Sequence, residues 1–97
     1  MNVLERSAFY DALVEGANAG ELSWGEVVRK LRVEVAGVDQ ATFSKMTKVS
    51  IRTIHKLESN VANPTLATLQ SVLRPFGLRI GLVRSGVASS SPGGRSL

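Results

Sequence analysis

Apolar residues recur between positions 2 and 76 at the spacings of helices rather than of strands. Two segments, Asn2 to Glu5 and Ser23 to Glu26, have the form of a capping box, in which a polar residue caps a first turn and a glutamate reaches back to it. The first helix is predicted over residues 2–15, before a glycine-bounded stretch at 16–20, and the second ends at Gly37. The expected core stripes are Leu4, Ala8, Ala12, Phe9 and Leu13 in the first helix, and Val27, Val28, Leu31 and Val35 in the second.

Three shorter helices follow. Asp39 is placed to cap a helix over residues 40–47, and Ser50 to cap one over 51–59 after a brief turn at Lys48 and Val49. Thr65 caps the last helix, which Pro75 and Gly77 end. The residues expected to point inward are Phe43, Met46, Val49, Ile54 and Leu57, then Leu66, Leu69, Leu73 and Phe76.

After Gly77 the apolar period changes to two, which predicts a strand over residues 78–83 with Leu78, Ile80 and Leu82 on one face. A lone strand would leave its backbone groups unpaired, so we expect it to pair with its copy in a second subunit. Residues 85–97 are rich in Gly and Ser, which predicts a flexible tail. The predicted fold is therefore all-α, a five-helix domain over residues 1–84 with a short strand paired across a dimer.

Composition narrows the class of protein. The chain has 97 residues, of which 43% are hydrophobic and 21% charged, enough for one modest core. It has no cysteine, so disulfides and thiolate metal sites are excluded and a reducing, cytoplasmic setting is expected. Neither a signal sequence nor an apolar run near the roughly 18 residues of a membrane span is present, so no membrane partner is expected.

Charge is divided unevenly along the chain. Residues 1–26 hold one basic and five acidic residues, a net charge of −4, whereas residues 27–56 hold seven basic and two acidic residues, a net charge of +5. The second segment is suited to a polyanion, although a solvated basic surface would have the same composition.

Residues 39–60 combine a short helix, a tight turn and exposed polar residues at the start of a second helix. The segment resembles the phage-repressor-like Xre/Cro helix-turn-helix family, and the likeness covers about residues 24–78. The matching residues are Gln40, Val49-Ser50, Thr53-Ile54, Glu58 and the run from Asn63 to Leu69. The resemblance implies a lambda-repressor-like fold, nucleoid-associated DNA binding and a structural ion pair between Arg32 and Glu58. Lys48 departs from it, since the family usually has a glycine in the turn.

By this resemblance, base edges are contacted from the exposed face of the second helix and phosphates from the positions flanking it. The expected base contacts are Ser50, Ile51, Arg52, His55 and Lys56, and the expected phosphate contacts are Gln40, Lys48 and Asn60. Arg52 is the strongest candidate because a guanidinium bonds guanine O6 and N7 together, while Ile51 can only touch a thymine methyl. A solvated face remains the alternative for Arg52 and Lys56.

Catalytic chemistry has no visible site in the sequence. His55 is the only histidine and has neither a second metal ligand nor a paired nucleophile. Glycines do not form a phosphate-binding loop, so no enzyme activity, metal or cofactor is expected. Trp24, Phe43 and Phe76 could serve as base-stacking platforms, but their helical spacing favours the core.

A strand directly after the last helix is similar in layout to HipB-type antitoxins. That resemblance implies a homodimer that represses its own operon at an inverted-repeat operator and binds a HipA-like kinase toxin. Two alternatives stay open, a stand-alone phage or restriction-system regulator and a protein-interaction module on the same scaffold. The acidic first helix could face a toxin or extend the core.

Overall fold

The computed structural model describes residues 1–61 and 63–84, and helices make up most of this part of the chain. Its elements are α1 (Val3–Asn18), α2 (Trp24–Lys30), η1 (Leu31–Ala36), α3 (Gln40–Thr47), α4 (Ile51–Glu58), α5 (Leu66–Leu73) and η2 (Arg74–Phe76). The predicted all-α, five-helix architecture is confirmed. The predicted tail, residues 85–97, lies outside the described residues.

Each predicted N-cap is confirmed, because a short polar side chain precedes each α-helix and accepts a backbone N–H from its first turn. The capping residues are Asn2, Ser23, Asp39, Ser50 and Thr65. The first two form full capping boxes, in which the glutamate also accepts the N–H of the cap. These bonds satisfy donors that have no partner inside the helix, so local sequence alone determines where each helix begins.

The ends of the first two helices differ in how well the sequence predicted them. The first helix was expected to end at Glu15 but continues to Asn18, because Gly16 is buried under the Leu22 side chain and Gly20, at φ 77°, makes the turn. The second ends at Gly37 as predicted, with φ 65°. Its last stretch, η1, has the wider i to i+5 hydrogen bonding of a π-helix.

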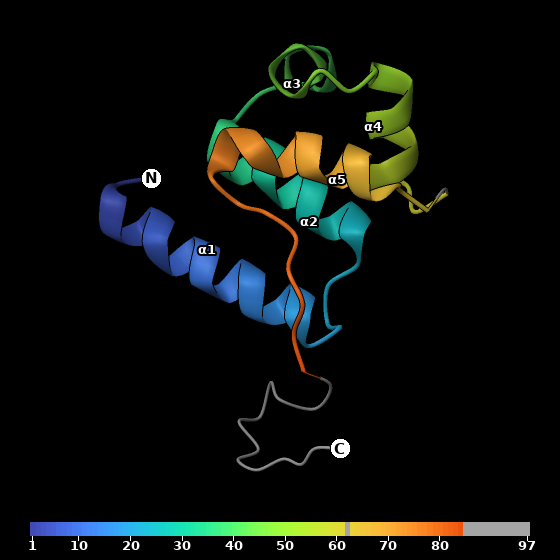
Figure 1. The fold of residues 1–97 in the computed structure, drawn as a ribbon. Coiled ribbons are helices and arrows are strands. Elements are labelled where there is room, and N and C mark those ends of the chain that lie inside the picture. The colour runs from blue at the N-terminus through green and yellow to red at the C-terminus, as the bar shows by residue number, and fades with distance from the viewer. Residues whose placement is uncertain (62, 85–97) are drawn as a thin grey trace.

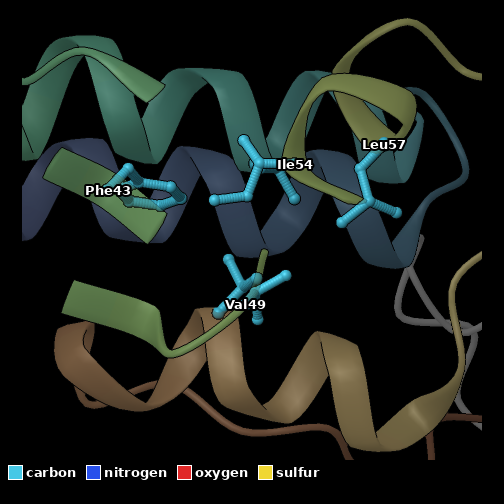
Figure 2. Packing of buried hydrophobic residues seen from close by; sticks show 6 residues of the cluster. Phe43, Val49, Ile54 and Leu57 are labelled. Atoms are coloured by element: carbon cyan, nitrogen blue, oxygen red, sulfur yellow. The ribbon is translucent and has the colours of Figure 1, made fainter. Parts of the chain in front are cut away.

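α2 lies between two hydrophobic clusters and contributes to both. In Figure 1, α3 and α4 lie at one end of the molecule and α1 at the other, with α2 and α5 between them. Val28 faces the cluster on the α3 and α4 side, and its neighbour Val27 faces the cluster against α1. The first cluster is Val28, Phe43, Val49, Ile54, Leu57 and Val72, four of which Figure 2 labels; the second is Leu13, Val27, Leu31 and Leu73.

Several residues predicted to be core are exposed instead. The first turn of α1 stands clear of the core, so Leu4 is 81% exposed, and Ala8 and Ala12 are exposed because they lie on the outer face of the helix. From Phe9 onward the inner face of α1, with Tyr10, Leu13 and Ala17, packs against the second cluster. The other corrections are Trp24, Met46 and Leu66, all exposed, and Val72, a core residue the predicted stripe omitted.

Residues 78–83 do not form a strand within the described part of the chain. Leu78 and Ile80 pack against the second cluster, while Leu82 is fully exposed. The alternation was therefore predicted correctly for the first two residues, but the chain's own helices cover that face. A strand needs a ladder partner, so pairing with a second chain stays a prediction.

None of the described helices combines the length and apolar composition that a bilayer crossing would need.

Gly25 lets α2 lie close against the end of α4. A Cβ at this position would collide with the carbonyl oxygen of Leu57 and lie 2.5 Å from Asn60 Oδ1. We predict that Gly25→Ala lowers the free energy of unfolding by about 2 kcal/mol, because a backbone oxygen cannot move aside as a flexible side chain can. Urea unfolding followed by circular dichroism measures this. Gly81→Ala, where a Cβ meets nothing within 4 Å, is the control and should leave stability unchanged; equal stability of both variants would contradict the close contact.

Candidate nucleic-acid interface

The turn between α3 and α4 is held by two hydroxyl side chains. Ser44 Oγ donates to the Val49 carbonyl at 2.6 Å, and Thr47 Oγ1 donates to the Phe43 carbonyl at 2.8 Å. Thr47 Oγ1 also accepts the Val49 N–H at 3.3 Å. These bonds satisfy the backbone where the chain leaves α3, which matters because Thr47 is buried. Sequence reasoning missed both residues, although Ser and Thr beside a turn are a known signal for such bonds.

Lys48 adopts the left-handed conformation that the family resemblance implies for this turn, with φ 60° and ψ 29°. Its backbone N–H donates to the Ser44 carbonyl at 2.9 Å, closing the last turn of α3. A lysine in this conformation costs roughly 1 kcal/mol relative to glycine. Its side chain is exposed beside the start of α4.

α4 has one buried face and one polar face. Ile54 and Leu57 point into the core together with Phe43 and Val49, so the helix cannot rotate without opening that cluster (Figure 2). The opposite face carries the predicted base-contacting side chains Ile51, Arg52, His55 and Lys56, all of them exposed. The exposed face is therefore set by the packing of the buried one.

Ser50 lies at the same end of α4 but is engaged in capping it. Its Oγ accepts the Thr53 N–H at 3.1 Å and donates to Thr53 Oγ1 at 2.8 Å. A base contact by Ser50 would have to share this oxygen or replace the bond to the threonine hydroxyl.

The predicted ion pair between Arg32 and Glu58 is present and two-pronged. Arg32 Nε donates to Glu58 Oε2 at 2.6 Å, and Nη2 donates to Oε1 at 2.8 Å. Arg32 Nη1 also donates to the Val38 carbonyl at 3.0 Å. The side chains are only 12% and 5% exposed, so the pair joins η1 to the end of α4 away from water.

Gln40 also takes part in this hydrogen-bond network. Its Nε2 donates to Glu58 Oε1 at 3.2 Å, which ties the first residue of α3 to the last residue of α4. The predicted phosphate contact would then use the remaining amide hydrogen or the backbone N–H at the start of α3. Asn60, another predicted phosphate contact, follows α4 in a left-handed conformation at φ 56° and is exposed.

The network shifts the titration of both charged partners. Burial raises the pKa of Glu58, but hydrogen bonds from Arg32 and Gln40 and the nearby guanidinium charges outweigh burial, so the pKa lies below its ordinary value. The hydrogen bond to Glu58 raises the pKa of Arg32, against the opposing effect of burial. Both groups are therefore charged at neutral pH.

The basic residues of α3, the turn and α4 have no ion-pair partners within residues 1–61 and 63–84. These residues are Lys45, Lys48, Arg52 and Lys56, all exposed. The ion pairs found in this part of the chain are Lys30–Glu34 and Arg32–Glu58. These four cations lie on α3, α4 and the turn between them, so the end of the molecule remote from α1 (Figure 1) is electropositive.

Comparison with known proteins agrees with this geometry. A family model described as "Helix-turn-helix" matches residues 28–83, more than half of the chain. The match begins within α2 and leaves α1 outside it. No curated protein and no solved structure matches the chain.

Replacing Glu58 with glutamine tests the ion pair through pH. Since the pKa of Glu58 is lowered on folding from its ordinary 4.5, its contribution to stability is complete above that value and is lost as pH falls through the folded-state pKa. We predict that Glu58→Gln is less stable than the parent by about 2–3 kcal/mol at pH 7, and that the difference shrinks below about pH 4.5. Urea unfolding from pH 7 to 3 measures both. A difference independent of pH would contradict a charged Glu58.

Proposed function

Because the chain belongs to the helix-turn-helix family, we propose that it is a homodimeric transcriptional repressor that reads an operator by placing α4 in the major groove. Members of this family are DNA-binding transcriptional regulators; repression, dimerisation and the residues that contact DNA are the proposal. The role is binding rather than catalysis, and it would be carried out in the cytoplasm, at the nucleoid.

One observation carries the proposal: α4 is fixed on its inner face by Ile54 and Leu57 and presents uncompensated cations on its outer face. A side chain that reads bases must start from a backbone held in one position, since a small displacement breaks a bidentate bond. The core cluster and the Arg32–Glu58 pair supply this rigidity at the middle and end of α4.

Arg52 is the proposed principal base contact. It lies in the first turn of α4, the part of a helix that enters the groove, and its guanidinium is exposed and without an ion-pair partner among the described residues. Ile51, 47% exposed beside it, offers an apolar contact to a thymine methyl. His55 and Lys56, one turn later, would reach further bases or the sugar-phosphate backbone.

Phosphate contacts are proposed on either side of α4, from Lys48 before it and from Gln40 and Asn60 near its end. Lys48 contributes charge, and Gln40 contributes donors at the start of α3. Phosphate contacts fix the register of the protein on the duplex and carry no base preference.

The dimer is proposed to form through the C-terminal segment, residues 78–83. Two recognition helices related by a two-fold axis would meet two half-sites about one helical turn apart, so the operator is an inverted repeat. Backbone bonds to other segments reach only Leu78 within the described part of this segment, which supports its availability for pairing.

The finer proposal is that the repressor is an antitoxin of HipB type that also binds a kinase-like toxin. It rests on the layout of a short extended segment after the last helix. Co-expression with any kinase-like protein that its neighbouring gene encodes, followed by size-exclusion chromatography, tests it. A chain that elutes alone from such a mixture, or has no such neighbour, is instead a stand-alone regulator.

We predict that Arg52→Ala weakens operator binding by about 1–3 kcal/mol and relaxes preference at one base pair per half-site. The operator is first selected from random duplexes, and affinity is then measured by fluorescence anisotropy. Arg52→Lys is the matched control, since it keeps the charge and loses the planar fork, so it should lose base preference while keeping most non-specific affinity. Unchanged base preference in both variants would remove Arg52 from the readout.

Gln40→Ala is expected to weaken binding to all sequences similarly, because phosphates carry no sequence information. The same selection on this variant measures its base preference. A changed preference would overturn the phosphate assignment of Gln40.

A further inference from the structure

An apolar groove lies at the end of the molecule opposite α4, between α1, the start of α2 and the C-terminal segment. It has a volume of about 150 Å³. We call it the α1 groove; its lining is mostly apolar and consists of Leu13, Val14, Ala17, Asn18, Trp24, Val27, Leu73, Leu78, Arg79, Ile80 and Gly81. Leu13, Val27 and Leu73 are core residues, whereas Val14 and Trp24 are 42% and 39% exposed. The second hydrophobic cluster is therefore left open to water along this groove.

The α1 groove continues into a shallower hollow with an acidic edge. The two hollows share Val14, Asn18 and Leu78, and the second is also lined by Asp11 and Glu15. Neither carboxylate has an ion-pair partner among residues 1–61 and 63–84. A segment that fits this surface has an apolar side chain followed closely by a basic one.

The chain carries such a segment directly beside the groove. Leu82 is fully exposed and Val83 is 59% exposed, and Arg84 follows them. Leu82 continues the alternation of Leu78 and Ile80, which pack inward, but no helix of its own chain covers it. Leu82 is therefore an apolar side chain that is free to enter a groove on another molecule.

Antiparallel pairing of two C-terminal segments would bring Leu82 to the α1 groove of the other chain. Directly opposite residues in an antiparallel pair point to the same face. If Ile80 lies opposite its own copy, Leu78 lies opposite Leu82 of the partner, beside the groove. A shift by one residue would place Gly81 or Val83 opposite Leu78 and turn Leu82 of the partner to the other face, away from the groove, so the first register is favoured.

We propose that Leu82 of a second copy of this chain fills the α1 groove, so that α1 is part of the dimer interface. An apolar cavity of about 150 Å³ accommodates a benzene-sized molecule, so the groove has room for a leucine side chain. Arg84 of the partner lies two residues beyond Leu82, on the same face and toward Asp11 and Glu15. The inference rests on the proposed homodimer and gives α1, which the family match does not cover, a function.

Trp24 reports directly on this contact, because it is the only tryptophan of the chain and lies in the groove. In the full-length protein, its emission should shift to shorter wavelength as concentration rises through the dimerisation range, since the partner's Leu82 excludes water. Leu82→Asp should abolish the shift and raise the dimer dissociation constant, measured by sedimentation, by roughly a hundredfold or more, because two leucine side chains leave the interface together. Leu82→Met, which keeps an apolar side chain, should show the parental Trp24 shift and the parental dimer dissociation constant.

Leu66→Asp is the matched control, since Leu66 is also exposed but lies on α5, outside the groove. It should leave the Trp24 shift and the dimer unchanged. Because Leu82 makes no contact with its own core, Leu82→Asp should keep the parental helical circular dichroism, which separates loss of the dimer from loss of the fold.

Disulfide trapping tests the geometry, since the chain has no cysteine of its own. Val14→Cys and Leu82→Cys are purified separately, one with a size tag, then mixed and oxidised. A crosslinked species of the mixed size supports the proposal. A mixture of Val14→Cys with Leu66→Cys should give no such species.

The outcomes separate this inference from the proposed function. If the parent protein binds no operator but shows the Trp24 shift and the crosslink, the proposed repressor function is overturned and the groove contact stands. A parent that sediments as a dimer and binds an inverted repeat, but shows no Trp24 shift and keeps its dimer on Leu82→Asp, would overturn the groove contact alone. A parent that stays monomeric throughout would overturn both the dimer and the groove contact.

Discussion

The buried ion pair between Arg32 and Glu58 is the constraint on which the placement of α4 depends. It joins η1 to the last residue of α4 and, through Gln40, to the first residue of α3. Such a pair offsets the cost of removing two charges from water only when its hydrogen bonds are nearly complete, which forces three elements into one arrangement. The contacts of the apolar cluster stabilise the packed helices without depending on direction. The hydrogen bonds of the ion pair, by contrast, require one orientation of α4.

Local features of the fold could be predicted because they depend on a few adjacent residues. Asp39 and Ser50 cap their helices through bonds to residues three positions later, and Gly37 ends its helix in the left-handed conformation. The exposure of Arg52 and Lys56 followed from the burial of Ile54 and Leu57 at helical spacing. In the site, the Arg32–Glu58 pair was expected from family resemblance, not from spacing.

Features that depend on which elements meet could not be predicted from periodicity. Leu66 has the spacing of a core residue, but α5 begins beyond the edge of the cluster and leaves it 63% exposed. The engagement of Gln40 with Glu58 requires the ends of α3 and α4 to be adjacent, which their sequences do not state. For the same reason, the alternation of Leu78 and Ile80 predicted one covered face but not that the helices of their own chain cover it.

Lys48 sets conformational stability against affinity at a single position. Its backbone occupies a conformation that glycine would adopt with less strain, while its side chain adds a cation beside the start of α4. In the proposed role, a glycine at position 48 would give a more stable protein that binds DNA with lower affinity. Selection for thermal stability would thus favour glycine at this position, and selection for binding to the operator would favour lysine. The lysine is the residue expected where selection for binding was the stronger of the two.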